Sequence, residues 1–124
     1  MTGRVLPDPD IVTTTINGDC HFVDLTFDYI LARKAMGKYG LESQMDLVVE
    51  ELSELIMAIQ KWKRYGASDA TRFAIATEHA DVELMLAQLS YMMTQVHQMT
   101  YERDLDYNRV YKRERLAAIL GGEL

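Results

Sequence analysis

Apolar residues recur at spacings of three, four or seven in two long segments, and this pattern most restricts how the chain can fold. The first segment carries Met45, Val48, Leu52, Leu55, Ile59 and Trp62. The second carries Ile75, Val82, Leu86, Leu89, Met93 and Val96. Such spacing is typical of a helix that packs along its length. The sequence therefore predicts two long helices, each with one buried face.

Helix-breaking residues are concentrated at the N-terminal end. Both prolines, Pro7 and Pro9, lie there, and Asn17-Gly18 is a strong turn signal. We expect residues 1–20 to form an extended arm with at most a short hairpin. No alternating strand pattern of useful length follows. Residues 21–124 should then form a single all-α domain, a four-helix bundle.

Capping signals suggest where the four helices begin and end. Gly37 and Gly40 favour the end of the first helix, and Gly66 the end of the second. Ser68 or Asp69 is the expected N-cap of the third. The helices are predicted over about 24–37, 42–65, 69–100 and 101–120. The short link at residues 66–68 makes the second and third helices antiparallel neighbours.

Composition limits the classes of function. The net charge of −6 argues against a nucleic-acid-binding protein, because no excess of cations is available for phosphates. Cys20 is the only cysteine, so no internal disulfide can form. No signal peptide and no apolar run long enough to span a membrane is apparent. A soluble cytoplasmic protein without a membrane partner is the expectation.

Acidic residues border both apolar faces. Glu51 and Glu54 fall about 80° and 140° to one side of the first face, at about 100° per residue. Glu78 and Asp81 fall about 40° and 100° from the second face, in the same rotational sense. In an antiparallel pair, equal offsets place both flanks on one side, and the two acid pairs differ in axial level by only about 4–5 Å. The four carboxylates are predicted to converge.

Converging carboxylates at the edge of a core repel one another and are costly to keep ionised. A hard divalent cation removes that cost, and Mg²⁺ or Mn²⁺ prefers oxygen ligands. Each acid taken singly is more simply explained as part of a solvated helix flank. The match of all four in side and level favours a metal site instead.

The acidic pattern also resembles a known signature. "EELSE", containing Glu50, Glu51 and Glu54, is followed after 23 residues by "EHAD", containing Glu78 and Asp81. This is similar to the EExxE…ExxD motif of the MazG-like family of all-α nucleoside triphosphate pyrophosphohydrolases, over residues 25–120. The resemblance implies hydrolysis of the α–β bond of a nucleoside triphosphate, giving a monophosphate and pyrophosphate. It implies that Glu51, Glu54, Glu78 and Asp81 bind Mg²⁺, with Glu50 supporting the site or activating water.

Phosphate-binding cations are expected on the last helix. Asn108, Lys112 and Arg115 share one face, and the Lys-to-Arg spacing of three resembles a C-terminal pattern of the same family. A solvated charged face is the alternative. We expect Lys61, Lys63 and Arg64 to complement the dipole at the end of the second helix rather than to bind substrate.

Other residues are assigned more ordinary roles. Trp62 is expected to pack, and His79 to be a neighbour of the metal site rather than a ligand. Phe22, Phe27 and Tyr29 are candidates for a base pocket. The sequence does not show which of these aromatic side chains faces inward.

Two further functions compete with the enzyme. A non-catalytic helical oligomer would use the acids only for solubility, whereas a di-iron bundle is disfavoured because neither Glu51 nor Glu78 has a histidine three residues on. The second helix is also apolar at Val49, Ile56 and Met57. One hairpin cannot cover this surface, so we expect a homodimer or a dimer of dimers.

Overall fold

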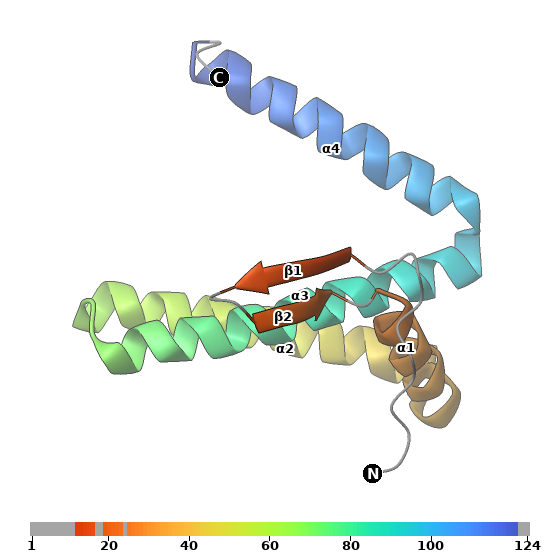
Figure 1. The fold of residues 1–124 in the computed structure, drawn as a ribbon, viewed down its shortest axis with the longest axis horizontal. Coiled ribbons are helices and arrows are strands. Elements are labelled where there is room, and N and C mark those ends of the chain that lie inside the picture. Colours follow the sequence, from red (N-terminus) through yellow and green to blue (C-terminus); the bar gives the residue numbers. More distant parts are fainter. Residues whose placement is uncertain (1–11, 17–18, 24, 122–124) are drawn as a thin grey trace.

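The computed structural model describes residues 12–16, 19–23 and 25–121. Four helices follow a two-stranded hairpin (Figure 1). The helices are α1 (Leu25–Tyr39), α2 (Leu41–Tyr65), α3 (Asp69–His97) and α4 (Met99–Ile119). The predicted helical fold with four helices is thereby confirmed.

The strands lie in the segment predicted as an arm with at most a short hairpin. β1 (Val12–Ile16) pairs antiparallel with β2 (Asp19–Val23), and Val12 lies opposite Val23. Asn17-Gly18, the predicted turn signal, lies outside the described residues. The hairpin crosses the expected boundary between residues 20 and 21.

The turn between α2 and α3 follows from its local sequence. Gly66 has a φ of 86°, in the left-handed region where glycine carries no penalty. Ser68 then caps α3: the Thr71 amide donates to Ser68 Oγ at 3.1 Å, and the Ser68 amide donates to Thr71 Oγ1 at 3.0 Å. This reciprocal pair is a capping box, which satisfies two backbone donors at the helix start. The predicted end of α2 and start of α3 are both confirmed.

Two other helix ends differ from expectation. Of the two glycines expected at the end of the first helix, Gly40 follows that end with a φ of 88°, whereas α1 continues past Gly37 to Tyr39. The boundary between α3 and α4 falls at Gln98, which has a φ of 54°, although no glycine marks it. A left-handed residue there turns the chain sharply, so α4 leaves the direction of α3 (Figure 1).

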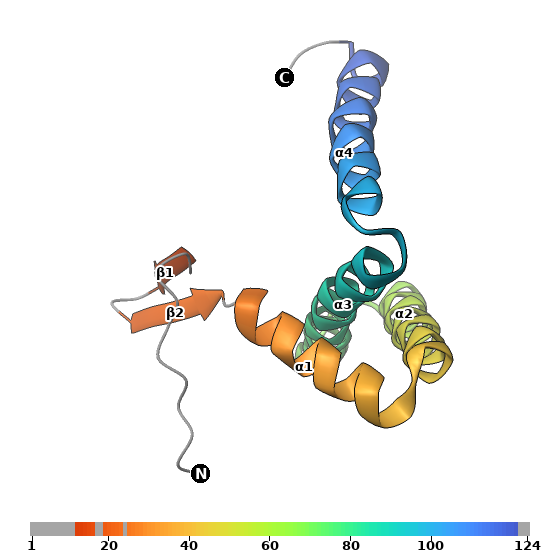
Figure 2. The same ribbon diagram turned by 90° about the vertical axis from the view of Figure 1, so that its right-hand side faces the viewer.

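The helices pack around α3. α2 lies antiparallel beside it, α1 crosses both near one end, and α4 packs against α3 alone among the described elements. Viewed along the hairpin, α4 rises away from α3, whereas α1 crosses below α3 and continues into α2 (Figure 2). Val48, Met85 and Met92 form the buried centre, and half-buried Met36, Leu41, Met45, Leu47, Leu84 and Leu89 surround it.

The buried faces of α2 and α3 are rotated relative to prediction. In α2, Gln44, Val48 and Ala58 are buried, whereas Leu52, Ile59 and Trp62 are 37%, 42% and 43% exposed. In α3, Val82, Met85, Gln88 and Met92 are buried, whereas Leu86 and Val96 are exposed. The expectation that Trp62 packs in the core was therefore wrong for the single chain. Each helix carries more apolar surface than one neighbour covers.

Among the described residues, no helix is both long and apolar enough to cross a membrane.

Candidate functional site

Three carboxylates from α2 and α3 meet in the middle of the helical hairpin. Glu51, Glu54 and Glu78 each offer an oxygen atom, and these three atoms lie within 4.8 Å of one another. All three side chains are half-buried. The predicted convergence therefore occurs for these three acids, which we call the glutamate cluster.

The rotated helix faces explain why the cluster is so close to the core. Glu51 lies three residues after buried Val48 and seven before buried Ala58, so it occupies a position of the buried face itself. Glu78 lies four residues before buried Val82 and seven before buried Met85, so it occupies the buried face of α3. Two glutamates thus face each other across the α2–α3 contact, deeper than their predicted place at its border.

Two oxygen atoms of the cluster lack any partner. Oε2 of Glu51 and Oε2 of Glu78 are buried from solvent, and neither accepts a hydrogen bond. Leaving a buried carboxylate oxygen without a donor or cation is costly. The site therefore favours a proton or a cation at this point.

The same crowding raises the pKa values of two of the glutamates. Partial burial, followed by repulsion from Glu54 and Asp81, raises the pKa of Glu51 above its ordinary value of 4.5. Burial and then repulsion from Glu54 and Asp81 likewise raise the pKa of Glu78. Both shifts have the sign expected for carboxylates that share a confined space without a counter-charge.

Asp81 and Glu50 lie next to the cluster. Asp81 is half-buried and near enough to repel Glu51 and Glu78, but its carboxylate is not among the three that meet within 4.8 Å. Glu50 is exposed, one helical turn before Glu54 and about 40° from it around α2. Asp81 thus lies at the edge of the cluster, and Glu50 lies on the flank of α2 that carries Glu54.

The predicted phosphate-binding residues of α4 are not brought to the cluster within one chain. Asn108, Lys112 and Arg115 are all exposed; the Asn108 amide donates to the Asp104 carbonyl at 2.8 Å, and Lys112 lies over the Tyr111 ring at 5.8 Å. α4 packs on the side of α3 that carries Leu86 and Ser90, which point about 140° and 180° away from Asp81.

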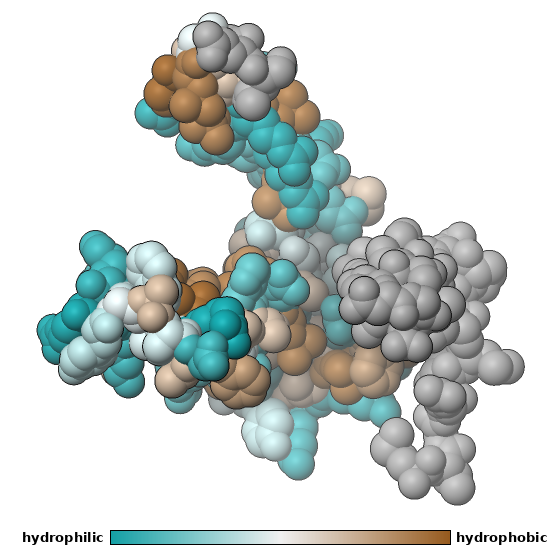
Figure 3. Space-filling view, turned by 60° about the vertical axis from the view of Figure 1, so that its left-hand side comes forward, coloured by the Kyte–Doolittle hydropathy of each residue, from teal (hydrophilic) through white to brown (hydrophobic). Residues whose placement is uncertain are grey.

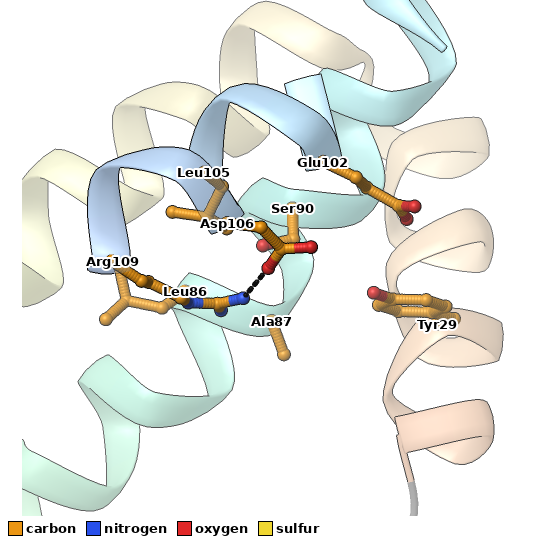
Figure 4. A pocket seen from close by; sticks show the side chains of 8 residues that line it. All are labelled: Tyr29, Leu86, Ala87, Ser90, Glu102, Leu105, Asp106 and Arg109. Atoms are coloured by element: carbon orange, nitrogen blue, oxygen red, sulfur yellow. Dashed lines mark hydrogen bonds and ion pairs between the residues drawn. The ribbon is translucent and has the colours of Figure 1, made fainter. Parts of the chain in front are cut away.

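A separate pocket of about 340 Å³ lies beside the α3–α4 contact, with Tyr29 of α1 on its remaining side (Figure 4). It is lined by Tyr29, Leu86, Ala87, Ser90, Glu102, Leu105, Asp106 and Arg109. Arg109 donates to Asp106 at 2.8 Å within it. The sequence suggested Tyr29 as a possible base contact but does not predict this pocket, because its walls come from three helices whose relative angles no local signal encodes.

The remaining candidates have local contacts. His79 Nε2 lies 3.1 Å from Glu83 Oε1. His79 is about 160° from Asp81 around α3, which is consistent with a neighbour of the site rather than a ligand. The Tyr29 ring lies 5.7 Å from that of Tyr91, and Phe27 is exposed. The side chain of Phe22 lies outside the described residues.

The donor set of the cluster fits a hard divalent cation. It consists only of carboxylate oxygens, which suit Mg²⁺ or Mn²⁺, and it contains no histidine or cysteine that would favour zinc. A cation between Glu51 and Glu78 would also satisfy the two unpartnered oxygens. The residues present are therefore consistent with such an ion.

Comparison of the chain with known proteins found no matching protein-family model, no matching curated protein and no matching solved structure.

Proposed function

We propose that the protein is a Mg²⁺-dependent nucleotide pyrophosphohydrolase, which cleaves the α–β bond of a nucleoside or deoxynucleoside triphosphate. The observation that carries this proposal is the glutamate cluster, in which two helices place three carboxylates together and leave two buried oxygens unpartnered. The resemblance of "EELSE" and "EHAD" to the MazG-like motif supports the same reaction. The nucleotide pool of the cytoplasm is the proposed setting.

Glu51, Glu54 and Glu78 would hold the ion, with Asp81 as a fourth carboxylate at its edge. Mn²⁺ could substitute, because it accepts the same oxygen ligands. When bound, the ion supplies positive charge that neutralises phosphate oxygens and makes the phosphorus more open to attack. The glutamates themselves fix its position between α2 and α3.

Glu50 is the proposed proton acceptor. Its exposed carboxylate lies on the same flank of α2 as Glu54, one turn away. There, one of its oxygens can accept the proton of a water whose oxygen bonds to phosphorus. The bond between this phosphorus and the oxygen that bridges the α- and β-phosphates breaks, and its electron pair stays on that oxygen.

The cations of α4 would serve the site of a second copy. Because α4 leaves α3 on the side opposite to Asp81, Asn108, Lys112 and Arg115 cannot complete the site of their own chain in this arrangement. Five cations and four acids lie on α4, and three of the cations lie between residues 112 and 115. This basic end complements the acidic first half of another copy's α2.

Self-association is the second part of the proposal. Val49, Leu52, Ile56 and Ile59 are spaced three, four and three residues apart and are 62%, 37%, 59% and 42% exposed; we call them the α2 stripe. The accessible surface of the chain is 10030 Å², whereas a compact monomer of this mass has roughly 6,800 Å². A two-fold axis would pair the stripe with its own copy.

A second exposed apolar surface lies at the end of α4, with Leu116, Ile119 and Leu120 (Figure 3). Two such surfaces are compatible with a homodimer or a dimer of dimers. They also favour the alternative function, a non-catalytic helical oligomer in which the acids bind no substrate.

The test is to incubate the protein with each common nucleoside and deoxynucleoside triphosphate in Mg²⁺ and to measure released pyrophosphate. The proposal predicts pyrophosphate and monophosphate in equal amounts, and loss of both products in EDTA. Glu54→Gln should lack the activity. If none of the nucleotides is cleaved, the non-catalytic alternative stands.

A further inference from the structure

Lys61 shares the flank of α2 that carries the proposed catalytic residues. It lies seven residues after Glu54, which places it about 10.5 Å further along the helix and only about 20° away around it. Glu50 lies four residues before Glu54 on the same flank. The order along this side of α2 is therefore Glu50, the glutamate cluster and then Lys61.

Two small residues lie near the α2–α3 contact between the cluster and Lys61, and the exposed Met57 lies on the outer side of α2 at this level. Ala58 of α2 is buried, and Ala74 of α3 is half-buried. Ala74 and Lys61 are at nearly the same level, seven and six residues from Ala67 in the turn. No long side chain at these two positions separates the carboxylates from the ammonium group.

The ammonium group of Lys61 is accessible to a ligand. Its side chain is exposed, and none of the ion pairs formed among the described residues includes it. The neighbouring cations differ: Lys63 points about 180° away from Glu54 around α2, and Arg64 lies over the Tyr65 ring at 5.9 Å. Both lysines lie near the C-terminal end of α2, so a favourable interaction with the helix dipole would not distinguish Lys61 from Lys63.

We infer that Lys61 binds the pyrophosphate portion of the triphosphate. The inference rests on the proposed function and orients its substrate. The terminal phosphates point along α2 toward the α2–α3 turn, and the nucleoside points the other way, toward the end of the hairpin where α1 crosses. An ammonium group on a flexible four-carbon stem suits phosphate oxygens that leave with the product. Lys61 thereby supplies from its own chain a cation that α4 does not.

The experiment compares Lys61→Ala with Lys63→Ala in the full chain. Binding of inorganic pyrophosphate and of a nucleoside monophosphate is measured by calorimetry in Mg²⁺, together with thermal melts. Lys61→Ala should weaken pyrophosphate binding about 10- to 100-fold, the loss of one charge-assisted contact. Monophosphate binding should be unchanged, and Lys63→Ala should match wild type for both.

The possible outcomes separate this inference from the proposed function. Equal pyrophosphate binding by wild type and Lys61→Ala, while wild type cleaves a nucleotide, overturns the role of Lys61 and leaves the enzyme intact. Equal weakening by the two substitutions also overturns it, because a general charge effect would explain both. A wild type that neither binds pyrophosphate nor cleaves nucleotides overturns the inference and the proposed function together. Lys61→Arg, which keeps the charge, should retain most of the pyrophosphate affinity.

Discussion

Asp81 lies beside the three glutamates rather than among them, so its contribution can be separated from theirs. Asp81→Asn is nearly isosteric and should leave the fold intact while removing a charge that supports the ion. We predict a loss of about 10- to 100-fold in kcat/KM, the usual cost of weakening a metal site from its edge. Glu83→Gln, two residues along α3 and paired with His79, is the matched control. Full activity of Asp81→Asn with unchanged Mg²⁺ dependence would exclude Asp81 from the site.

The raised pKa values of Glu51 and Glu78 predict how stability depends on pH without metal. Between the ordinary value of 4.5 and the raised folded-state pKa values, the folded chain binds more protons than the unfolded chain. Stability therefore falls as pH rises through this window. Glu51→Gln removes one such group, so its stability relative to wild type should increase with pH.

Urea unfolding in EDTA, from pH 4.5 upward, measures this difference. Glu42→Gln, an exposed acid at the start of α2, is the control and should change little. A Glu51→Gln variant that parallels wild type at every pH would show that Glu51 is not crowded.

At the scale of elements, helix bounds were the most predictable feature. Gly66 and Ser68 fixed one turn through backbone conformation and capping, which are local properties. The boundary between α3 and α4 was predicted at residues 100–101 but lies at Gln98. A glutamine with a positive φ carries no sequence signal comparable to that of a glycine or a capping serine. The angle of α4 depends on that single torsion and on distant contacts, so no pattern could predict it.

The site was predictable in part for a related reason. Periodicity placed Glu51, Glu54 and Glu78 on adjoining flanks, and three carboxylates do meet. The spacing predicted Leu52 and Ile59 on the buried face of α2. In the structure, Gln44 and Ala58 are buried and Glu51 is half-buried. Hydrophobicity alone does not distinguish a face that packs within the chain from one that a second copy covers.

The position of α4 gives an element-scale prediction. If its cations complete the site of a second copy, Lys112→Ala should weaken triphosphate binding by about 1.5–3 kcal/mol. Chains with Glu54→Gln and chains with Lys112→Ala, each poorly active alone, should recover activity when mixed. In a dimer, about a quarter of the sites would be intact.

Steady-state assays after unfolding and refolding the two variants together measure this recovery, with each refolded alone as the control. Recovered activity in the mixture would contradict a site whose residues all come from one chain. A mixture no more active than the mean of its parts contradicts the role of α4 in a second copy.

At the scale of the whole molecule, the α2 stripe predicts an assembly. Ile56→Asp places a charge in its middle, and burying that charge in an interface would be costly. Sedimentation velocity should show the variant at half the mass of wild type or less, with a lower melting temperature. Ala80→Glu, on an exposed position of α3, should sediment as wild type. A monomeric wild type would exclude the proposed interface.

The central claim is that the glutamate cluster is a divalent metal site, and thermal melts test it most directly. Mg²⁺ binds the folded site but hardly the unfolded chain, so it should stabilise wild type by roughly 2–3 kcal/mol at about a hundred times its dissociation constant. NaCl at matched ionic strength should do much less, because it screens charge without occupying the site. Glu54→Gln should be more stable than wild type in EDTA and respond weakly to Mg²⁺. A wild type that responds equally to Mg²⁺ and to matched NaCl would show that these acids form no metal site.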